Sequence, residues 1–190
     1  MEKRVQRFLP FKDVHTRSEG ESKNIEGYFA VYGDVYELWP GATESIAPGA
    51  FTESICGDVR ALYNHNDDLV LGRTSAGTLE LREDSHGLWG KIAINPNDAE
   101  AVNAYARVER GDITGASFGF AIEEEETEYR EDGSIHWTIK KINPLYEISP
   151  CAFPAYEATS IHARKDEYDN IRKRQVDAWK IKAKERIKNA

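Results

Sequence analysis

The sequence predicts a mainly β protein of the α+β class. Three observations lead to this prediction. Short runs rich in Val, Ile, Leu, Tyr and Trp recur from residue 27 onward, and within them apolar and polar residues alternate. Turns that contain Gly, Pro or Asp separate these runs. One stretch, residues 98–111, has instead the apolar period of an amphipathic helix.

Five strands are expected before this helix. The turn between the last two is Asp84-Ser85-His86-Gly87, which is rich in turn-forming residues. Residues 39–51 contain repeated Pro and Gly, so we expect a long loop that leads into a short helix at 50–55. The expected strands cover residues 27–35, 59–65, 68–72, 77–83 and 87–94.

The helix expected at residues 98–111 carries signals at both ends. Asp98 can cap its N-terminus, and Gly111 can end it in a left-handed conformation. One face of this helix is apolar and is expected to be buried; it consists of Ala101, Val102, Tyr105 and Val108.

Two longer strands follow the helix, at residues 114–126 and 134–149. Glu131-Asp132-Gly133-Ser134 supplies a hairpin turn between them. The acidic run at residues 123–126 is expected to lie on a solvated strand end, because four carboxylates in a row do not fit a core.

Charge divides the chain near residue 163. The net charge is −8, but residues 163–190 hold ten Lys and Arg against five acidic residues and carry +5, which leaves −13 on residues 1–162. We expect an N-terminal arm (1–24), a central domain (25–162) and a basic amphipathic helical tail (163–190). The acidic body argues against nucleic-acid binding, since phosphate contacts need clustered Lys and Arg. The tail helix has an apolar stripe of Val176, Trp179, Ala183 and Ile187.

The sequence lacks the signals of several protein classes. No stretch approaches the roughly 20 apolar residues that cross a bilayer, and the first residues lack the apolar core of a secretory signal. We therefore expect synthesis and function in a cytoplasm. Cys56 and Cys151 lack the spacing of a zinc or disulfide site, so both are expected to be buried small hydrophobic residues. No motif for a cofactor or a metal is present, and none is expected to bind.

Two residues have the chemistry of a serine hydrolase. Ser117 lies in Gly115-Ala116-Ser117-Phe118-Gly119, which matches the GxSxG pattern of a nucleophile elbow. The strands around it are of the hairpin type rather than parallel βαβ units, which excludes the α/β-hydrolase fold. Ser117 can equally be a small residue that permits close packing in a Gly-rich strand. His65 stands where an apolar strand meets a polar turn, a place for catalytic groups and for ordinary polar residues.

Seven segments stand in a particular order along roughly residues 25–162: GYFAVYGDV, IAPGAFTESI, VRALYNHN, LGRTSAGTLELRED, GLWGKIAI, GASFGF and LYEISPCAFPAYEAT. Each is modest alone. In this order and spacing they resemble the prohead proteases of tailed double-stranded DNA phages, a family similar in core fold to the herpesvirus capsid-maturation protease.

This resemblance implies a fold and a set of roles. The fold would be a closed or nearly closed, antiparallel-rich β-barrel surrounded by a few helices, with the C-terminal helix in addition. Ser117 would be the nucleophile and His65 its general base. In the herpesvirus relatives a second histidine orients the base, whereas the matching strand here offers Glu147, which shares a strand face with Ser149. We therefore expect Glu147 to orient His65, and His162 is the alternative, which would recreate a Ser-His-His arrangement.

Two further groups are candidates for supporting the reaction. The backbone amides around residues 117–119 are expected to bind the oxyanion, since glycine permits unusual backbone angles there. Arg73 either assists these amides or fixes a loop through an ion pair with the acidic body.

The function implied by the resemblance is that of a serine endopeptidase in the interior of the procapsid, in the cytoplasm of a bacterial host. It would cleave scaffold segments from the major capsid protein, and also itself, with no nucleic-acid or membrane partner. A homo-oligomer is one form that it could take. The alternatives are a non-catalytic capsid-assembly or scaffold-binding protein with a protease-like fold, and a cytoplasmic esterase or amidase. The tail is expected to target the chain into the shell or to be trimmed by self-cleavage.

Overall fold

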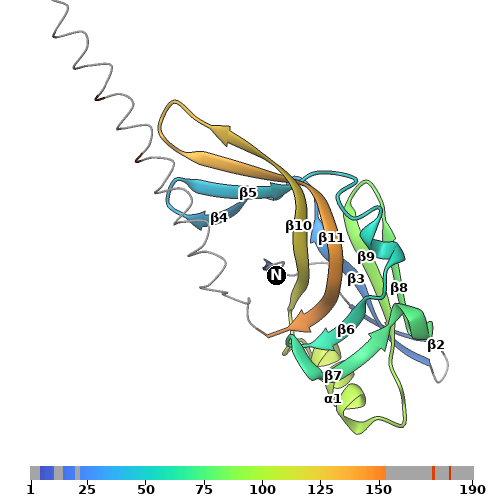
Figure 1. Ribbon diagram of the computed structural model, residues 1–190. Coiled ribbons are helices and arrows are strands. Elements are labelled where there is room, and N and C mark those ends of the chain that lie inside the picture. The colour runs from blue at the N-terminus through green and yellow to red at the C-terminus, as the bar shows by residue number, and fades with distance from the viewer. Residues whose placement is uncertain (1–4, 11–14, 20–21, 153–172, 174–179, 181–190) are drawn as a thin grey trace, which may run out of the picture. The chain divides into compact units, whose positions relative to one another are not determined.

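A computed structural model describes residues 5–10, 15–19 and 22–152, together with Lys173 and Lys180 (Figure 1). The chain divides into two compact units, Met1–Tyr156 and Glu157–Ala190. Almost all described residues belong to the first unit, and the fold below is that of this unit. No helix among the described residues combines the length and the apolar character needed to cross a bilayer.

A long hairpin forms the centre of the first sheet. Its strands are β10 (Gly115–Tyr129) and β11 (Ile135–Cys151), which pair antiparallel along their length. β1 (Val5–Pro10) pairs with β10, while β5 (Ala42–Ile46) runs parallel to the start of β11 and carries β4 (Tyr36–Trp39) on its other side. β6 (Arg60–Tyr63) runs parallel to the far end of β11 and turns back into β7 (Asn66–Arg73). β11 thus has different partners at its two ends.

The second sheet has the order β2-β3-β9-β8 and packs against the first. Its strands are β2 (His15–Glu19), β3 (Ser22–Val31), β8 (Leu79–Glu83) and β9 (Gly87–Ala93). The sheets approach closely at Gly90, where a Cβ atom would lie 2.9 Å from the Ile148 side chain of β11 and 3.1 Å from Phe29. A core of buried side chains from both sheets, including Phe29, Phe118 and Ile148, fills the space between them.

The helix expected in the middle of the chain is confirmed as α1 (Ala99–Arg110). The Asp98 carboxylate caps it by accepting hydrogen bonds from the backbone N–H groups of Glu100 and Ala101, at 2.9 and 3.3 Å. Gly111 ends it with a φ of 84°, a left-handed conformation that favours glycine. The local end signals were therefore sufficient to define this element.

The predicted closed barrel is wrong. The described strands form two separate sheets, and each keeps two edge strands, β1 and β4 in the main path of the first and β2 and β8 in the second. The reason lies in β11, whose 17 residues extend beyond the core and pair with different strands at each end, so the first sheet branches instead of closing. The surrounding helices are also fewer than expected: the described residues contain α1 and two short 3₁₀ segments, η1 (Ser54–Cys56) and η2 (Thr74–Ala76). The predicted C-terminal helix falls outside the described residues.

The long loop expected at residues 39–51 is also wrong in part. Pro40 and Gly41 instead form the tight turn of the β4–β5 hairpin, with Gly41 at a φ of 86°, as a type II turn with Pro-Gly at its centre requires. The short helix expected at 50–55 is present only as η1. Cys151 is buried as predicted, whereas Cys56 is exposed.

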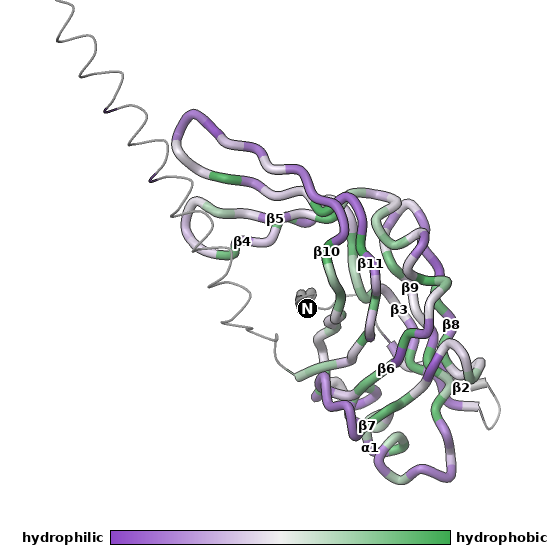
Figure 2. The backbone as a smooth tube through the Cα atoms, viewed as in Figure 1, coloured by the Kyte–Doolittle hydropathy of each residue, from purple (hydrophilic) through white to green (hydrophobic). Residues whose placement is uncertain are grey.

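The acidic run on β10 lies where it was expected. Residues 123–126 are exposed, and Figure 2 shows a hydrophilic end of the β10–β11 hairpin beside β4 and β5. Apolar residues concentrate instead where this hairpin meets the second sheet. The start of β11 therefore lies beside the exposed acidic stretch of β10, although its own residues Ile135, Trp137 and Ile139 are buried, whereas its far end lies within the core shared by the two sheets.

Candidate active site

His65 lies at the tip of the β6–β7 hairpin. Tyr63 and Asn66 are paired across this hairpin, so Asn64 and His65 are its two central residues, with φ values of 53° and 59°. Positive φ at both positions is the mark of a type I′ turn. Asn and His are both enriched among the non-glycine residues that adopt this conformation, which costs an L-residue about 1–2 kcal/mol. A histidine kept in such a place suggests a role other than local stability.

Hydrogen bonds hold this turn against the end of β11. β6 runs parallel to β11, with Arg60 opposite Glu147, and the turn that follows reaches Ser149 and Pro150. The Asn64 backbone N–H donates to the Pro150 carbonyl at 3.1 Å. The Asn64 side chain in turn accepts from the Ala152 backbone N–H at 2.8 Å. The position of His65 is therefore set by a long-range parallel pairing.

The imidazole of His65 meets a buried carboxylate. Its Nδ1 lies 2.8 Å from Glu147 Oε1, and the side chains of His65 and Glu147 are 12% and 1% exposed. Because a carboxylate only accepts hydrogen bonds, Nδ1 carries the proton, and Nε2 of the neutral ring is left as an acceptor. Nε2 is buried and has no hydrogen-bond partner among the described residues. This is the tautomer that a general base needs.

Ser117 lies on the same face of the sheet as Glu147. It is paired with Ser149 across β10 and β11, and residues directly opposite or two apart on a strand share a face. Phe118 follows Ser117, and Ile148 lies between Glu147 and Ser149, so both side chains point to the other face, where they belong to the core. The fold thus places Ser117 at the same end and on the same face of the β10–β11 pair as Glu147, which contacts His65; no hydrogen bond joins Ser117 to Nε2 of His65. Ser117 is fully buried, with 0% exposed surface.

Comparison with known proteins adds an independent observation. A family model described as the caudovirus prohead serine protease matches residues 12–174. The chain belongs to this family. The prohead protease of Enterobacteria phage HK97 is 29% identical over 177 residues, which make up 90% of this chain and 74% of that protein. The capsid assembly protease of bacteriophage T4 is a structural neighbour with a TM-score of 0.47 and 9% identity, over 77% of this chain and 96% of that one.

Family membership confirms the resemblance stated from the sequence and supports a capsid maturation protease. The roles of individual residues in this chain remain predictions. His162, the alternative orienting residue, lies outside the described residues. Ser149 was missed as a functional candidate. Its position two residues after Glu147 on an alternating strand was the signal that could have found it.

A cysteine, Cys151, also lies near the site, but it is not a candidate nucleophile. Cys151 ends β11 and is buried. Burial, with a smaller contribution from the negative charge of Glu147, raises the pKa of the Cys151 thiol to about 12. The thiol therefore stays protonated at neutral pH, and only a thiolate would be an effective nucleophile.

Arg73 makes the ion pair that the loop interpretation requires. Its Nε donates to Asp58 Oδ1 at 2.8 Å, and its Nη2 contacts the other carboxylate oxygen, so the contact has two hydrogen bonds. Arg73 ends β7, opposite Arg60 at the open end of the hairpin whose tip carries His65. Arg73 therefore supports the base of this hairpin.

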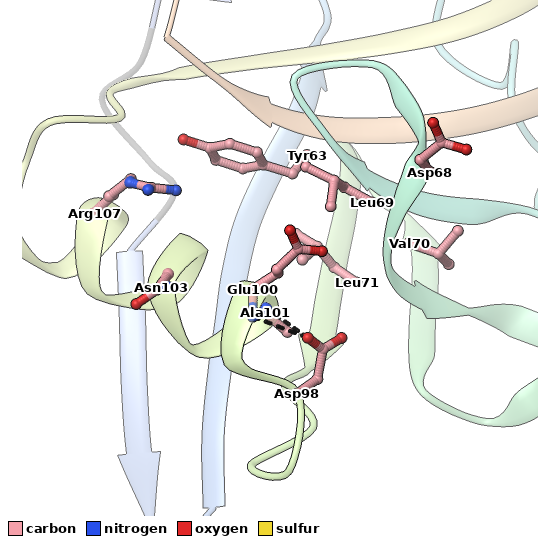
Figure 3. A pocket seen from close by; sticks show the side chains of 10 residues that line it. All are labelled: Tyr63, Asp68, Leu69, Val70, Leu71, Asp98, Glu100, Ala101, Asn103 and Arg107. Carbon is pink, nitrogen blue, oxygen red and sulfur yellow. Dashed lines mark hydrogen bonds between the residues drawn. The ribbon is translucent and has the colours of Figure 1, made fainter.

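A cavity of about 230 Å³ opens beside this hairpin, between β7 and α1. Figure 3 shows Tyr63 pointing across it toward Arg107 of α1, with Asp68 on the β7 side. Neither His65, Ser117 nor Glu147 lines this cavity. It borders the turn without containing the candidate catalytic groups, and we assign it no chemical step.

Proposed function

We propose that this prohead protease is a serine endopeptidase in which Ser117 is the nucleophile, His65 the general base and Glu147 the group that orients it. The observation that carries the proposal is the 2.8 Å contact between His65 Nδ1 and Glu147 Oε1, which leaves Nε2 unpartnered among the described residues. A serine hydroxyl is a poor nucleophile at neutral pH until an imidazole takes its proton, and a buried carboxylate stabilises the resulting cation.

The reaction has two halves. In the first, Ser117 Oγ attacks the peptide carbonyl while its proton passes to His65 Nε2; the C–N bond then breaks, and His65 returns this proton to the leaving amine. In the second, water attacks the acyl ester, gives its proton to His65, and the proton returns to Ser117 Oγ as the bond to the acyl group breaks. Glu147 accepts a hydrogen bond from Nδ1 throughout and supports the imidazolium formed in each half.

The proposed substrates are scaffold segments of the major capsid protein and the protease itself, cleaved inside the procapsid in the host cytoplasm. The name of the family, which refers to the prohead, supports this substrate class. In the test, the protease is coexpressed with the capsid protein of the same genome, and the mass of the capsid protein is measured. Wild type should shorten the capsid protein, whereas Ser117→Ala and His65→Ala should leave it intact. Equal shortening by Ser117→Ala would refute the assignment of the nucleophile.

Access to Ser117 requires a change in structure. Ser117 has 0% exposed surface, and a side chain buried in this way cannot meet a peptide carbonyl until the residues around it move. We expect the isolated chain to react slowly with a fluorophosphonate, and to react faster once it is incorporated into procapsids. Mass spectrometry of the labelled peptide identifies the serine.

The same burial favours a second candidate function, a capsid-assembly or scaffold-binding protein that keeps the protease fold without turnover. The coexpression experiment separates the two. A capsid protein of unchanged mass, copackaged with this chain, would support binding alone, and a shortened capsid protein supports catalysis.

A further inference from the structure

Ser149 is a buried serine for which the proposed mechanism has no use. It lies near the end of β11 with 0% exposed surface, directly opposite Ser117. Its hydroxyl makes two hydrogen bonds, and both go to the candidate catalytic groups. Ser149 Oγ donates to Glu147 Oε2 at 2.6 Å and accepts from the backbone N–H of His65 at 3.3 Å.

These contacts close a cycle. From the His65 backbone N–H the hydrogen bonds run to Ser149 Oγ, from there to Glu147 Oε2, and from Glu147 Oε1 back to Nδ1 of the same histidine. The backbone and the ring of His65 are thus tied to one carboxylate. A cycle of this kind fixes each member more firmly than separate contacts would, because no member can rotate without breaking a bond made by the next.

The contact with Glu147 determines which way its carboxylate faces. A glutamate side chain has several rotatable bonds and loses about 1.5–2 kcal/mol of conformational entropy when fixed. The Ser149 hydroxyl holds Oε2, so Oε1 is the oxygen that faces His65. The hydrogen bond from Ser149 also lowers the free-energy cost of burying the Glu147 carboxylate, which is 1% exposed.

The contact with His65 acts on a strained turn. His65 has a φ of 59°, a conformation that costs a non-glycine residue about 1–2 kcal/mol. Its backbone N–H has the Ser149 hydroxyl as acceptor. Loss of this acceptor would favour relaxation of the turn and would move the imidazole away from Glu147.

We propose that Ser149 is a positioning residue of the protease, which fixes the Glu147 carboxylate and the His65 turn so that Nε2 of His65 is presented for proton transfer. The proposal rests on the proposed function, because it takes His65 as the general base. Ser149 is not a second nucleophile in this arrangement. Its proton is committed to Glu147, and the unpartnered Nε2 of His65 does not receive it.

The first test measures the hydrogen bond and not the reaction. In protein with ¹⁵N-labelled histidine and the substitution Ser117→Ala, which prevents self-cleavage, the Nδ1 proton of His65 should give a low-field resonance. The absence of this resonance from a His65→Gln protein identifies it. Adding Ser149→Ala should abolish the resonance or broaden it through faster exchange with water, and Ser149→Thr, which keeps the hydroxyl, should restore it.

Ser54→Ala is the matched control. Ser54 is also buried, and its hydroxyl also makes a hydrogen bond, to the Phe51 carbonyl at 3.0 Å, but it contacts none of the candidate catalytic groups. It should lower stability by an amount similar to Ser149→Ala and leave the resonance unchanged. If Thr does not fit the buried position, Ser149→Cys, with its weaker donor, should give an intermediate exchange rate.

The second test is kinetic. In the otherwise wild-type protease, Ser149→Ala should lower kcat about 10- to 100-fold, the cost of a small misplacement of a catalytic group, with little change in KM. A kcat within twofold of wild type, or an unchanged Nδ1 resonance in the Ser149→Ala protein, would overturn the proposal. If even the wild-type protein cleaves no capsid protein, the proposed function fails, and the resonance alone decides whether Ser149 holds the pair.

Discussion

The two ends of β11 each carry a histidine contact, and the contacts differ in kind. At the start of the strand, His136 has both ring nitrogens hydrogen-bonded to hydroxyls of β5, with Nδ1 2.8 Å from Thr43 Oγ1 and Nε2 2.8 Å from Ser45 Oγ. At the other end, His65 has a carboxylate at Nδ1 and no partner at Nε2 among the described residues. The first arrangement leaves no ring nitrogen for a substrate, and the second leaves one.

This difference shows what makes a histidine suited to catalysis in this fold. Hydroxyls can donate or accept, so they satisfy an imidazole in either tautomer and give it no preference for a charge. A buried carboxylate accepts only, so it fixes the tautomer and stabilises the protonated ring. The surroundings of the ring, and not the presence of a nearby serine, separate the two sites.

The largest expected effect comes from removing each histidine in turn. His65→Ala should lower the rate of capsid-protein cleavage by about 10⁴-fold or more, because the serine then has no base. His136→Ala should leave this rate within a few fold of wild type. Mass spectrometry of the capsid protein over time measures both. A large loss in His136→Ala protein that is still folded would remove the distinction between the two ends.

Glu147→Gln should have the next largest effect. The amide keeps the shape of the side chain but supplies no charge and can offer its N–H₂ group to the ring, which favours the wrong tautomer. We expect a loss of about 10³- to 10⁴-fold in kcat. Glu44 provides the matched control, since it is a buried carboxylate on β5 paired with Trp137 near the start of β11. Glu44→Gln should affect stability and leave kcat near wild type; equal losses of kcat in both variants would indicate a general effect of buried charge.

The sequence predicted the parts of this comparison that depend on local pattern. Alternation along 134–149 placed Glu147 on one strand face, and the end signals at Asp98 and Gly111 defined α1. The parallel pairing of β6 with β11, which brings His65 to Glu147, joins segments more than 80 residues apart, and no local signal encodes it. The type I′ turn at His65 was not predicted either. The usual sequence signal for such a turn has Gly at the second position, and this turn has His there.

Closure of the sheet was misjudged for the same physical reason. Strand patterns give the number and the faces of strands, but the identity of each neighbour depends on long-range pairing. In the β4–β5 region, Pro40 and Gly41 indicated an irregular loop, although the same pair also suits a tight turn between two short strands. The β5 strand formed there is the one that supplies the hydroxyls for His136.

A smaller effect is expected at the start of β11 in the free energy of unfolding. His136→Phe keeps an aromatic ring, of somewhat larger size, but removes two hydrogen bonds, each worth about 0.5–1.5 kcal/mol, and leaves the Thr43 and Ser45 hydroxyls without this partner. We expect a loss of about 1–3 kcal/mol, measured as a lower urea midpoint at constant slope. The triple variant that adds Thr43→Val and Ser45→Ala should recover part of this loss. Failure of the triple variant to recover any stability would contradict the hydrogen-bond account.

The smallest effect is expected at the base of the hairpin that carries His65. Hydrogen bonds from Arg73, and then from Ser75, hold the pKa of the Asp58 carboxyl well below its ordinary value. A carboxyl with a lowered pKa in the folded state adds stability that is fully present above the unfolded pKa of about 3.9 and is lost as the pH falls below it. Arg73→Gln should therefore lower the urea midpoint slightly at pH 7, and the difference from wild type should shrink as the pH is lowered from about 4.5 toward 2.5.

Both side chains of this ion pair are partly exposed, so salt should weaken the effect as well. Asp58→Asn is the matching control and should show the same loss of pH dependence as Arg73→Gln. The kcat of Arg73→Gln decides between the two roles considered for this arginine. A kcat near wild type fits a residue that fixes the base of the hairpin, whereas a loss of 10²-fold or more, with the urea midpoint unchanged, would assign Arg73 to stabilisation of the oxyanion.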